Sequence, residues 1–381
     1  MEKRNNTKLI FFLLWLFLAG KIAAQKEGRS IETDLSYKGQ VSGWENINPG
    51  NAFPSNTGLR YIPQFNYEMN MPGEGMIDFE GSANIFGSMG LDPFEATQFD
   101  GKLKPYRLWA RFSTRQLELR AGLQKINFGS ASLLRPLMWF DQVDARDPLK
   151  LTDGVWGLLG RYYFLNNANV WLWGLLGNDN RKGWEILPSK KDIPEFGGRL
   201  QLPVPRGEAA FTFHRRTAEI NMDAIPENRY GFDTKLDLVV GFWLEGAWIN
   251  KRKNTGHYTN QEIFNAGVDY TFGLGNGLNV VYEQLMASYD EKPFEMKDPL
   301  SFSMLKVSYP IGLFDDLSLI FYYDWNNHSA YNFINWQKQF NKISLFVMGY
   351  VNPADYSIPT QGTGENIFAG SGVQVMIVFN H

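Results

Sequence analysis

Residues 116–126 read QLELRAGLQKI, and residues 155–164 read VWGLLGRYYF. In the first stretch Leu117, Leu119 and Leu123 alternate with charged or small residues. An apolar residue at every second position gives a strand one apolar and one polar face. The two stretches therefore predict strands that meet a different environment on each side.

The insert between these strands is the longest irregular segment in this part of the chain. Residues 127–153 read NFGSASLLRPLMWFDQVDARDPLKLTD. The two prolines and many charges disfavour a strand, whereas the leucine, methionine, tryptophan and phenylalanine disfavour a solvated loop. A long loop of this mixed character needs a partly enclosed place in which to pack. We expect it to fold into the lumen of a membrane β-barrel and to narrow that lumen.

The N-terminus predicts secretion. Basic residues precede an apolar run from 9 to 20, and KIAAQ offers a cleavage site after Ala24. This is the pattern of a signal peptide, so we expect residues 1–24 to be removed and residues 25–381 to form one barrel domain. The chain has no cysteine, which excludes a disulfide framework and a lipoprotein anchor at this signal. A secreted chain of this size without disulfides indicates a bacterial origin.

The composition favours an outer-membrane barrel. Aromatic residues make up 15% of the chain, yet the mean hydropathy is only -0.30. Barrel strands reconcile these values, because they are apolar on one face only and carry aromatic girdles at the membrane interfaces. The net charge of -3 gives no indication of a nucleic-acid partner.

From residue 31 onward the sequence predicts about 18 antiparallel strands, with 16 as the lower bound, in an all-β transmembrane barrel. Residues 331–336 give the weakest strand pattern. Short links alternate with long ones, among them 45–57, 88–102 and 178–192. Outer-membrane barrels have short periplasmic turns and long extracellular loops, so this alternation places both termini in the periplasm.

The phase of each strand predicts which charged residues face the lumen. The predicted lumen and constriction residues, from the wall and the insert, are Arg107, Arg111, Arg120, Arg135, Asp141, Asp144, Arg146, Asp147, Arg161 and Arg199. We expect an acidic wall opposite them, formed by Glu68, Asp78 and Glu80. A pore lined in this way would orient a charged or dipolar solute. Alternatively, these charges pair between neighbouring strands and stiffen the wall.

The apolar residues of the insert need partners of their own. We expect the group around Trp139 and Phe140 to pack on Trp109, Trp171 and Trp173, whose phases also point inward.

One segment resembles the strand-and-loop pattern of alginate-export-type outer-membrane porins. The matching residues are Arg120, Gly122, Gln124, Gly129, Leu134, Arg135, Asp153 and Gly154. The resemblance implies an eighteen-strand barrel with a charged constriction in its lumen. Leu123 departs from the family pattern, which has a second arginine there, so alginate is not implied as the substrate.

Catalysis and energised transport find little support in the sequence. The four histidines lie in no spaced catalytic or metal-binding motif, so we expect no enzyme activity, cofactor or metal. The first strand begins close to the mature N-terminus, which leaves no room for a plug domain.

Two functions remain open for the barrel. The first is a porin-like channel in outer-membrane lipid that passes small polar or anionic solutes, saccharides among them. The alternative is a barrel with a filled lumen that serves as a surface, assembly or partner-binding protein. The oligomeric state is not predicted.

Overall fold

The computed structural model of the chain describes residues 33–50, 53–71, 73–92, 97–143, 147–220, 223–354 and 367–381. The expected signal peptide therefore lies outside the described residues. Among the described residues, no helix is both long and apolar enough to cross a membrane.

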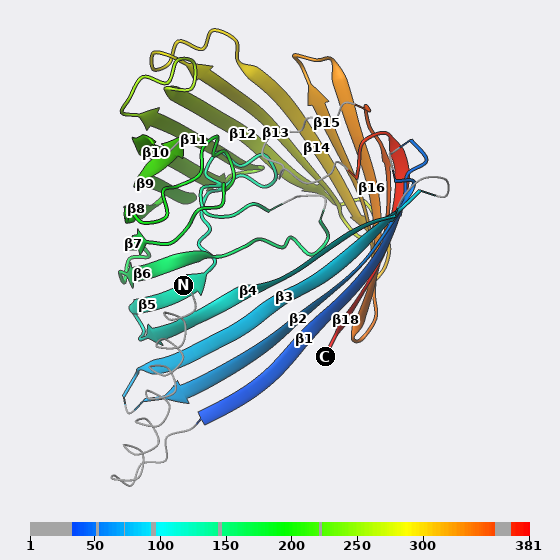
Figure 1. The fold of residues 1–381 in the computed structure, drawn as a ribbon, viewed down its shortest axis with the longest axis horizontal. Coiled ribbons are helices and arrows are strands. Elements are labelled where there is room, and N and C mark those ends of the chain that lie inside the picture. Colours follow the sequence, from blue (N-terminus) through cyan, green and yellow to red (C-terminus); the bar gives the residue numbers. More distant parts are fainter. Residues whose placement is uncertain are drawn as a thin grey trace.

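The 18 strands form one closed antiparallel sheet (Figure 1), as the alternating pattern predicts. Each strand pairs with its neighbours in the chain, and β1 also pairs with β18, so the sheet closes on itself. Closure pairs the backbone groups that an open edge would leave free.

The strands are β1 (Thr33–Ile47), β2 (Ser55–Asn70), β3 (Met76–Leu91), β4 (Thr97–Ser113), β5 (Leu117–Gln124), β6 (Val155–Tyr163), β7 (Asn169–Leu175), β8 (Glu195–Val204), β9 (Gly207–Ile220), β10 (Asp223–Asp237), β11 (Gly241–Lys251), β12 (Asn260–Phe272), β13 (Leu278–Asp290), β14 (Leu300–Pro310), β15 (Asp315–Asp324), β16 (Ser329–Gln339), β17 (Ile343–Val351) and β18 (Ser371–Asn380). The weakly patterned residues 331–336 belong to β16, which pairs with a strand on each side.

The two faces of the sheet differ in exposure. In β18, Val375 and Ile377 are exposed, whereas the intervening Met376 and the following Val378 are buried. Rows of exposed apolar side chains continue around the outside of the barrel, for example at Leu244 on β11. An apolar outer face suits lipid, and the buried residues therefore mark the inner face.

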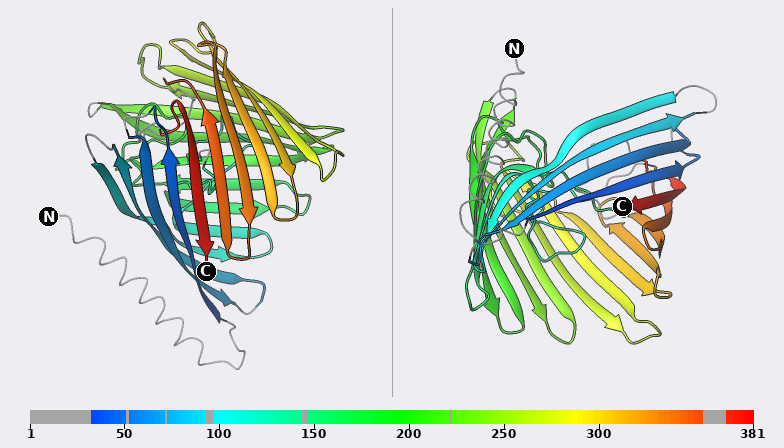
Figure 2. Two further views of the ribbon diagram at one scale, coloured as in Figure 1. Left: turned by 90° about the vertical axis from the view of Figure 1, so that its right-hand side faces the viewer. Right: turned by 90° about the horizontal axis from the view of Figure 1, so that it is seen from below.

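Links on one rim are generally longer than those on the other. The long links 125–154, 176–194 and 352–370 share a rim, and the short turns lie at the opposite rim (Figure 2). The backbone N–H of Asn380 donates to the Lys342 carbonyl in a short turn, so the C-terminus lies at the short-link rim.

Two predicted long links are wrong in extent. Both ends of 45–57 are strand, so β1 and β2 are separated only by residues 48–54, and most of 88–102 is strand because β3 continues to Leu91 and β4 begins at Thr97. Small and polar residues hide the apolar alternation there, but strand pairing requires only backbone groups.

Candidate functional site

The link 125–154 is bound to the inner wall through its backbone. Glu245 on β11 accepts hydrogen bonds from the backbone N–H groups of Ser130, Ala131 and Leu137 at 2.8, 2.9 and 2.6 Å. The Glu245 side chain is buried. Charge-assisted bonds of this kind are strong, and they compensate in part for burying the carboxylate.

Glu283 on β13 makes a matching set of contacts. It accepts from the backbone N–H groups of Ser132, Leu133 and Leu134 at 2.5, 3.0 and 2.8 Å. Glu245 and Glu283 together therefore hold consecutive residues of this link against β11 and β13. In Figure 1 the link leaves the sheet and crosses towards these strands.

The apolar residues of the same link pack on aromatic residues of the wall. Phe128 stacks on Trp173 with ring centroids 5.7 Å apart, and Phe140 meets Trp173 edge-on at 5.5 Å. Phe128 also contacts Trp171. The expected packing on Trp171 and Trp173 is present, whereas Trp109 instead lies beside arginines of the wall.

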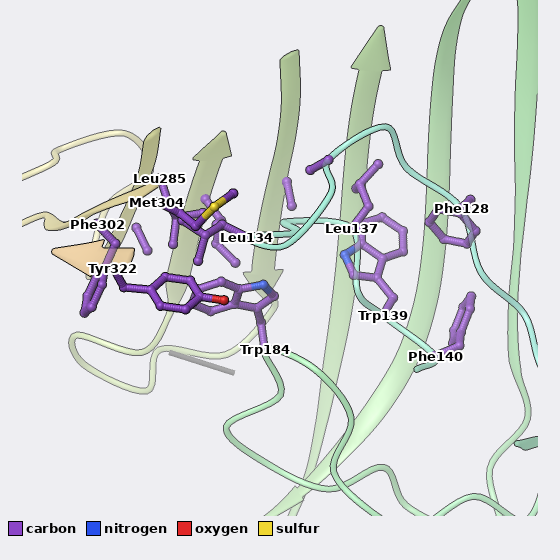
Figure 3. Packing of buried hydrophobic residues seen from close by; sticks show 14 of the residues in the cluster. Phe128, Leu134, Leu137, Trp139, Phe140, Trp184, Leu285, Phe302, Met304 and Tyr322 are labelled. Carbon is purple, nitrogen blue, oxygen red and sulfur yellow. The ribbon is translucent and has the colours of Figure 1, made fainter. Parts of the chain in front are cut away.

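A second part of the inner wall is apolar, contrary to the polar lining that the sequence predicts. Phe302, Met304 and Tyr322 on β14 and β15 are at most 2% exposed. Figure 3 shows Leu134 of the link 125–154 and Trp184 of the link 176–194 facing these residues. The sequence pattern does not reveal this patch, because strands that are apolar on both faces lose the simple alternation.

Several charges of the link stabilise the link itself. Arg135 pairs with Asp141 at 2.7 Å and also donates to Asn127 and to the Phe128 carbonyl. Asp147 accepts from the backbone N–H of Leu149. Arg135 and Asp141, both predicted to line the constriction, therefore form an ion pair with each other.

Asp144 and Arg146 lie outside the described residues.

Three arginines of the wall converge on one carboxylate. Arg120, Arg161 and Arg111 lie 2.9, 3.6 and 3.9 Å from Glu118. The arginine side chains are 14–26% exposed. Together with Asp78 these residues form the "open arginine cluster". The Arg161 guanidinium also lies 3.9 Å from the centre of the Trp171 ring, which fixes its orientation.

The acidic residues lie beside this cluster and not opposite it. Asp78 on β3 accepts from Arg111 Nε and Nη2 at 2.9 and 2.7 Å. Glu80 faces Trp109 across the same strand pair, and Glu68 on β2 is in register with Asp78. The expected opposition is wrong because β2, β3 and β4 are neighbours in the sheet.

Two further predicted lumen arginines, Arg107 and Arg199, are buried and hydrogen-bonded to other residues of the protein. Arg107 donates to the Thr152 carbonyl at 2.9 Å, at the end of the link 125–154. Arg199 forms a bidentate pair with Asp233 at 2.5 and 2.9 Å. Both side chains support the wall and its link.

A "buried arginine cluster" lies under the link 176–194. Arg216 and Arg229 are each 1% exposed in their side chains, and both pair with Glu227 and with Glu185 of the link. Alternation along β9 and β10 directs both arginines inward, but it gives no information about Glu185, which lies in a link. Nothing in the sequence pattern of the link shows that it turns back onto β9 and β10.

The link 176–194 also contacts the link 125–154 at its end. Lys182 Nζ donates to the Gly154 carbonyl at 3.2 Å, and burial lowers the pKa of Lys182. The charged ammonium is therefore less stable here than in water.

His214 is fully buried in the inner wall and makes two polar contacts. His214 Nε2 lies 3.0 Å from Glu195, and the other ring nitrogen accepts from Trp173 Nε1 at 3.2 Å. No nucleophile joins these contacts. Within the described ranges, no group of three or more potential metal ligands occurs.

The geometry defines a closed barrel with an apolar outer face and a partly charged inner face. No protein-family model and no curated protein matches the sequence. Among solved structures the chain is similar to OccAB4 of Acinetobacter baumannii, with a TM-score of 0.59 and 10% identity over 92% of this chain and 98% of that one. It is also similar to OccK7 (OpdD) of Pseudomonas aeruginosa, with a TM-score of 0.54 and 11% identity over 92% of this chain and 99% of that one.

A third similar structure is Wzi of Escherichia coli, described as an outer membrane protein involved in group 1 capsule assembly and as a carbohydrate-binding β-barrel. Its TM-score is 0.54, with 9% identity over 96% of this chain and 87% of that one. The fold is therefore that of porin-like outer-membrane β-barrels.

Proposed function

We propose that the chain is an outer-membrane channel for small polar or anionic solutes, narrowed by the link 125–154. The observation that carries this proposal is the attachment of the link to Glu245 and Glu283. Six backbone N–H groups of the link donate to these two inner-wall carboxylates. Because the link is held against the inner wall, we expect it to narrow the passage and still to leave the passage open.

The open arginine cluster gives the passage its charge preference. Within the cluster as defined, three guanidinium groups face two carboxylates, those of Glu118 and Asp78, so these five residues together carry one net positive charge, and Glu80 and Glu68 lie beside them. Because these side chains are partly exposed, a passing anion can approach them. The neighbouring carboxylates keep the attraction weak enough for release, which conduction requires.

We also propose that the chain shares with alginate-export-type porins the local structure of one strand, β5, and of the link 125–154 that follows it. A Cβ at Gly122 would lie 2.2 Å from the Leu108 carbonyl oxygen, and one at Gly129 would lie 2.6 Å from the Glu245 carboxylate. Both glycines also have positive φ. These matched positions thus have a structural reason, whereas Leu123 supplies no second arginine, and we propose no polyuronate specificity.

We also propose that the short-link rim and both termini face the periplasm. An epitope tag within 178–192 is expected to be accessible on intact cells, and a tag at Thr114 or Asn166 is not. Labelling at Thr114 or Asn166 would reverse the orientation.

Solute flux into proteoliposomes tests the channel directly. We expect swelling in small sugars and small organic anions, with rates that fall steeply as solute size increases. The matched control is liposomes that contain the heat-denatured protein. Equal rates with and without folded protein would contradict a channel.

The alternative function is a carbohydrate-binding or assembly barrel with a filled lumen. It is favoured by the apolar inner patch at β14 and β15, which two links cover. Saturable binding of an oligosaccharide without any flux would support this alternative.

A further inference from the structure

The outer face of the barrel carries an apolar groove of about 550 Å³ across β10 to β13. Gly246 and Ala266 form its floor, because glycine has no side chain and alanine only a methyl group, and both stand between larger outward-facing neighbours. Phe232, Phe264 and Met286 line its sides and are 37–42% exposed. The groove therefore opens towards the surroundings of the barrel and not towards its lumen.

Aromatic rings mark the end of the groove nearest the long-link rim. Trp248 lies 5.1 Å from Tyr230 and 5.3 Å from Phe294, measured between ring centroids. Phe294 belongs to the link 291–299, so the groove ends beneath this link. Tryptophan and tyrosine favour the level of the lipid headgroups.

A cationic pocket of about 420 Å³ lies directly beyond these rings. Arg252, Lys253 and Lys292 line it and are exposed, and with the buried Lys251 these four basic residues outnumber the one acidic lining residue, Glu291. Asn250 lines it as well, and Asn250 follows Trp248 of the groove by two residues, about 7 Å along the strand. The groove and the pocket are thus one continuous surface.

We propose that this surface binds one phosphate-bearing membrane lipid. An acyl chain would lie over Gly246 and Ala266, and the phosphate would lie among Arg252, Lys253 and Lys292. Basic residues at the membrane surface attract anionic headgroups, and the groove beside them faces the hydrocarbon. A second copy fits this surface less well, because a two-fold contact there would bring like charges together.

Native mass spectrometry of the full-length protein in detergent tests the proposal. With dioleoylphosphatidylglycerol and dioleoylphosphatidylcholine in equal amounts, we expect preferential retention of one phosphatidylglycerol. Each basic residue near an anionic headgroup contributes about fivefold in affinity. The variant Arg252→Ser, Lys253→Ser, Lys292→Ser loses three such contributions and should therefore bind about a hundredfold more weakly. The matched control, Arg115→Ser, Arg181→Ser, Lys191→Ser, removes three exposed cations elsewhere and should retain the lipid.

The variant Ala266→Leu tests the groove while leaving the cationic pocket intact. Leucine is compatible with a lipid-facing position, and it should weaken retention of phosphatidylglycerol by filling the floor of the groove. Unchanged retention in this variant, or equal losses in the two triple variants, would overturn the proposal. So would full competition by inorganic phosphate, or a protein dimer in place of the lipid complex.

Discussion

The open and buried arginine clusters lie on the same inner face of the barrel and differ in how they are covered. In the buried cluster the arginine side chains are 1% exposed and pair with a carboxylate of the link 176–194. In the open cluster they are 14–26% exposed, and every carboxylate comes from the wall. An inward direction is therefore not sufficient for contact with solute. The links decide which charges remain accessible.

The largest expected difference between the two clusters is in stability. Arg229→Ala leaves Glu185 and Glu227 short of a partner in a buried site, which should cost about 3–5 kcal/mol. Arg161→Ala in the open cluster should cost only about 1 kcal/mol, because Glu118 keeps Arg120 and Arg111 as partners. Urea unfolding in lipid vesicles measures both losses. Similar losses would show that the clusters are equally buried.

The comparison depends on which residues face inward, and the outer face tests that assignment. Leu119 is exposed between the inward Glu118 and Arg120. Leu119→Arg should cost about 2–4 kcal/mol near the middle of the membrane. Leu119→Phe is the control and should be tolerated. Equal stability of the two variants would place Leu119 away from lipid.

Weakening the attachment of the link 125–154 should expose more of the wall. Glu283→Gln replaces a charged acceptor of backbone N–H groups by an amide, with an expected loss of about 1.5–3 kcal/mol. The looser link should raise single-channel conductance and current noise. Glu208→Gln, on β9 near the short-link rim, is the control. Unchanged conductance in Glu283→Gln would mean that the link does not narrow the passage.

We expect a smaller difference between the two clusters when the effect of one substitution in each on ion selectivity is compared. Glu118→Gln removes a partly exposed negative charge and should raise the anion-to-cation permeability ratio about fivefold, if about 1 kcal/mol is gained at contact distance in water. Glu227→Gln in the buried cluster should leave this ratio unchanged in the protein that folds. Reversal potentials measured in a salt gradient report both ratios. A larger change in Glu227→Gln than in Glu118→Gln would invert the comparison.

The fold was predictable from the sequence because each strand carries its own signal. Alternation in segments such as 117–124 gives the strand and its inward residues, and the succession of links gives an even strand number. The packing of Phe140 on Trp173 could also be anticipated, because an apolar link must find an apolar partner.

The sequence allowed charge pairing between neighbouring strands as an alternative, but it could not identify which charges pair with which. Arg135 forms an ion pair with Asp141 within its own link, and Asp78 forms an ion pair with Arg111 on the adjacent strand. Strand phase gives the direction of a side chain but not its nearest partner. Likewise, Glu185 reaches the wall only because of how its link folds, which depends on contacts between residues far apart in sequence.

The most direct test of the account is the reversal potential of the purified protein in a planar bilayer under a potassium chloride gradient. We predict a steady open current that favours chloride. The variant Arg111→Ser, Arg120→Ser, Arg161→Ser should lose this preference while retaining current. No steady current, or the same reversal potential in the wild type and the variant, would contradict a channel governed by the open arginine cluster.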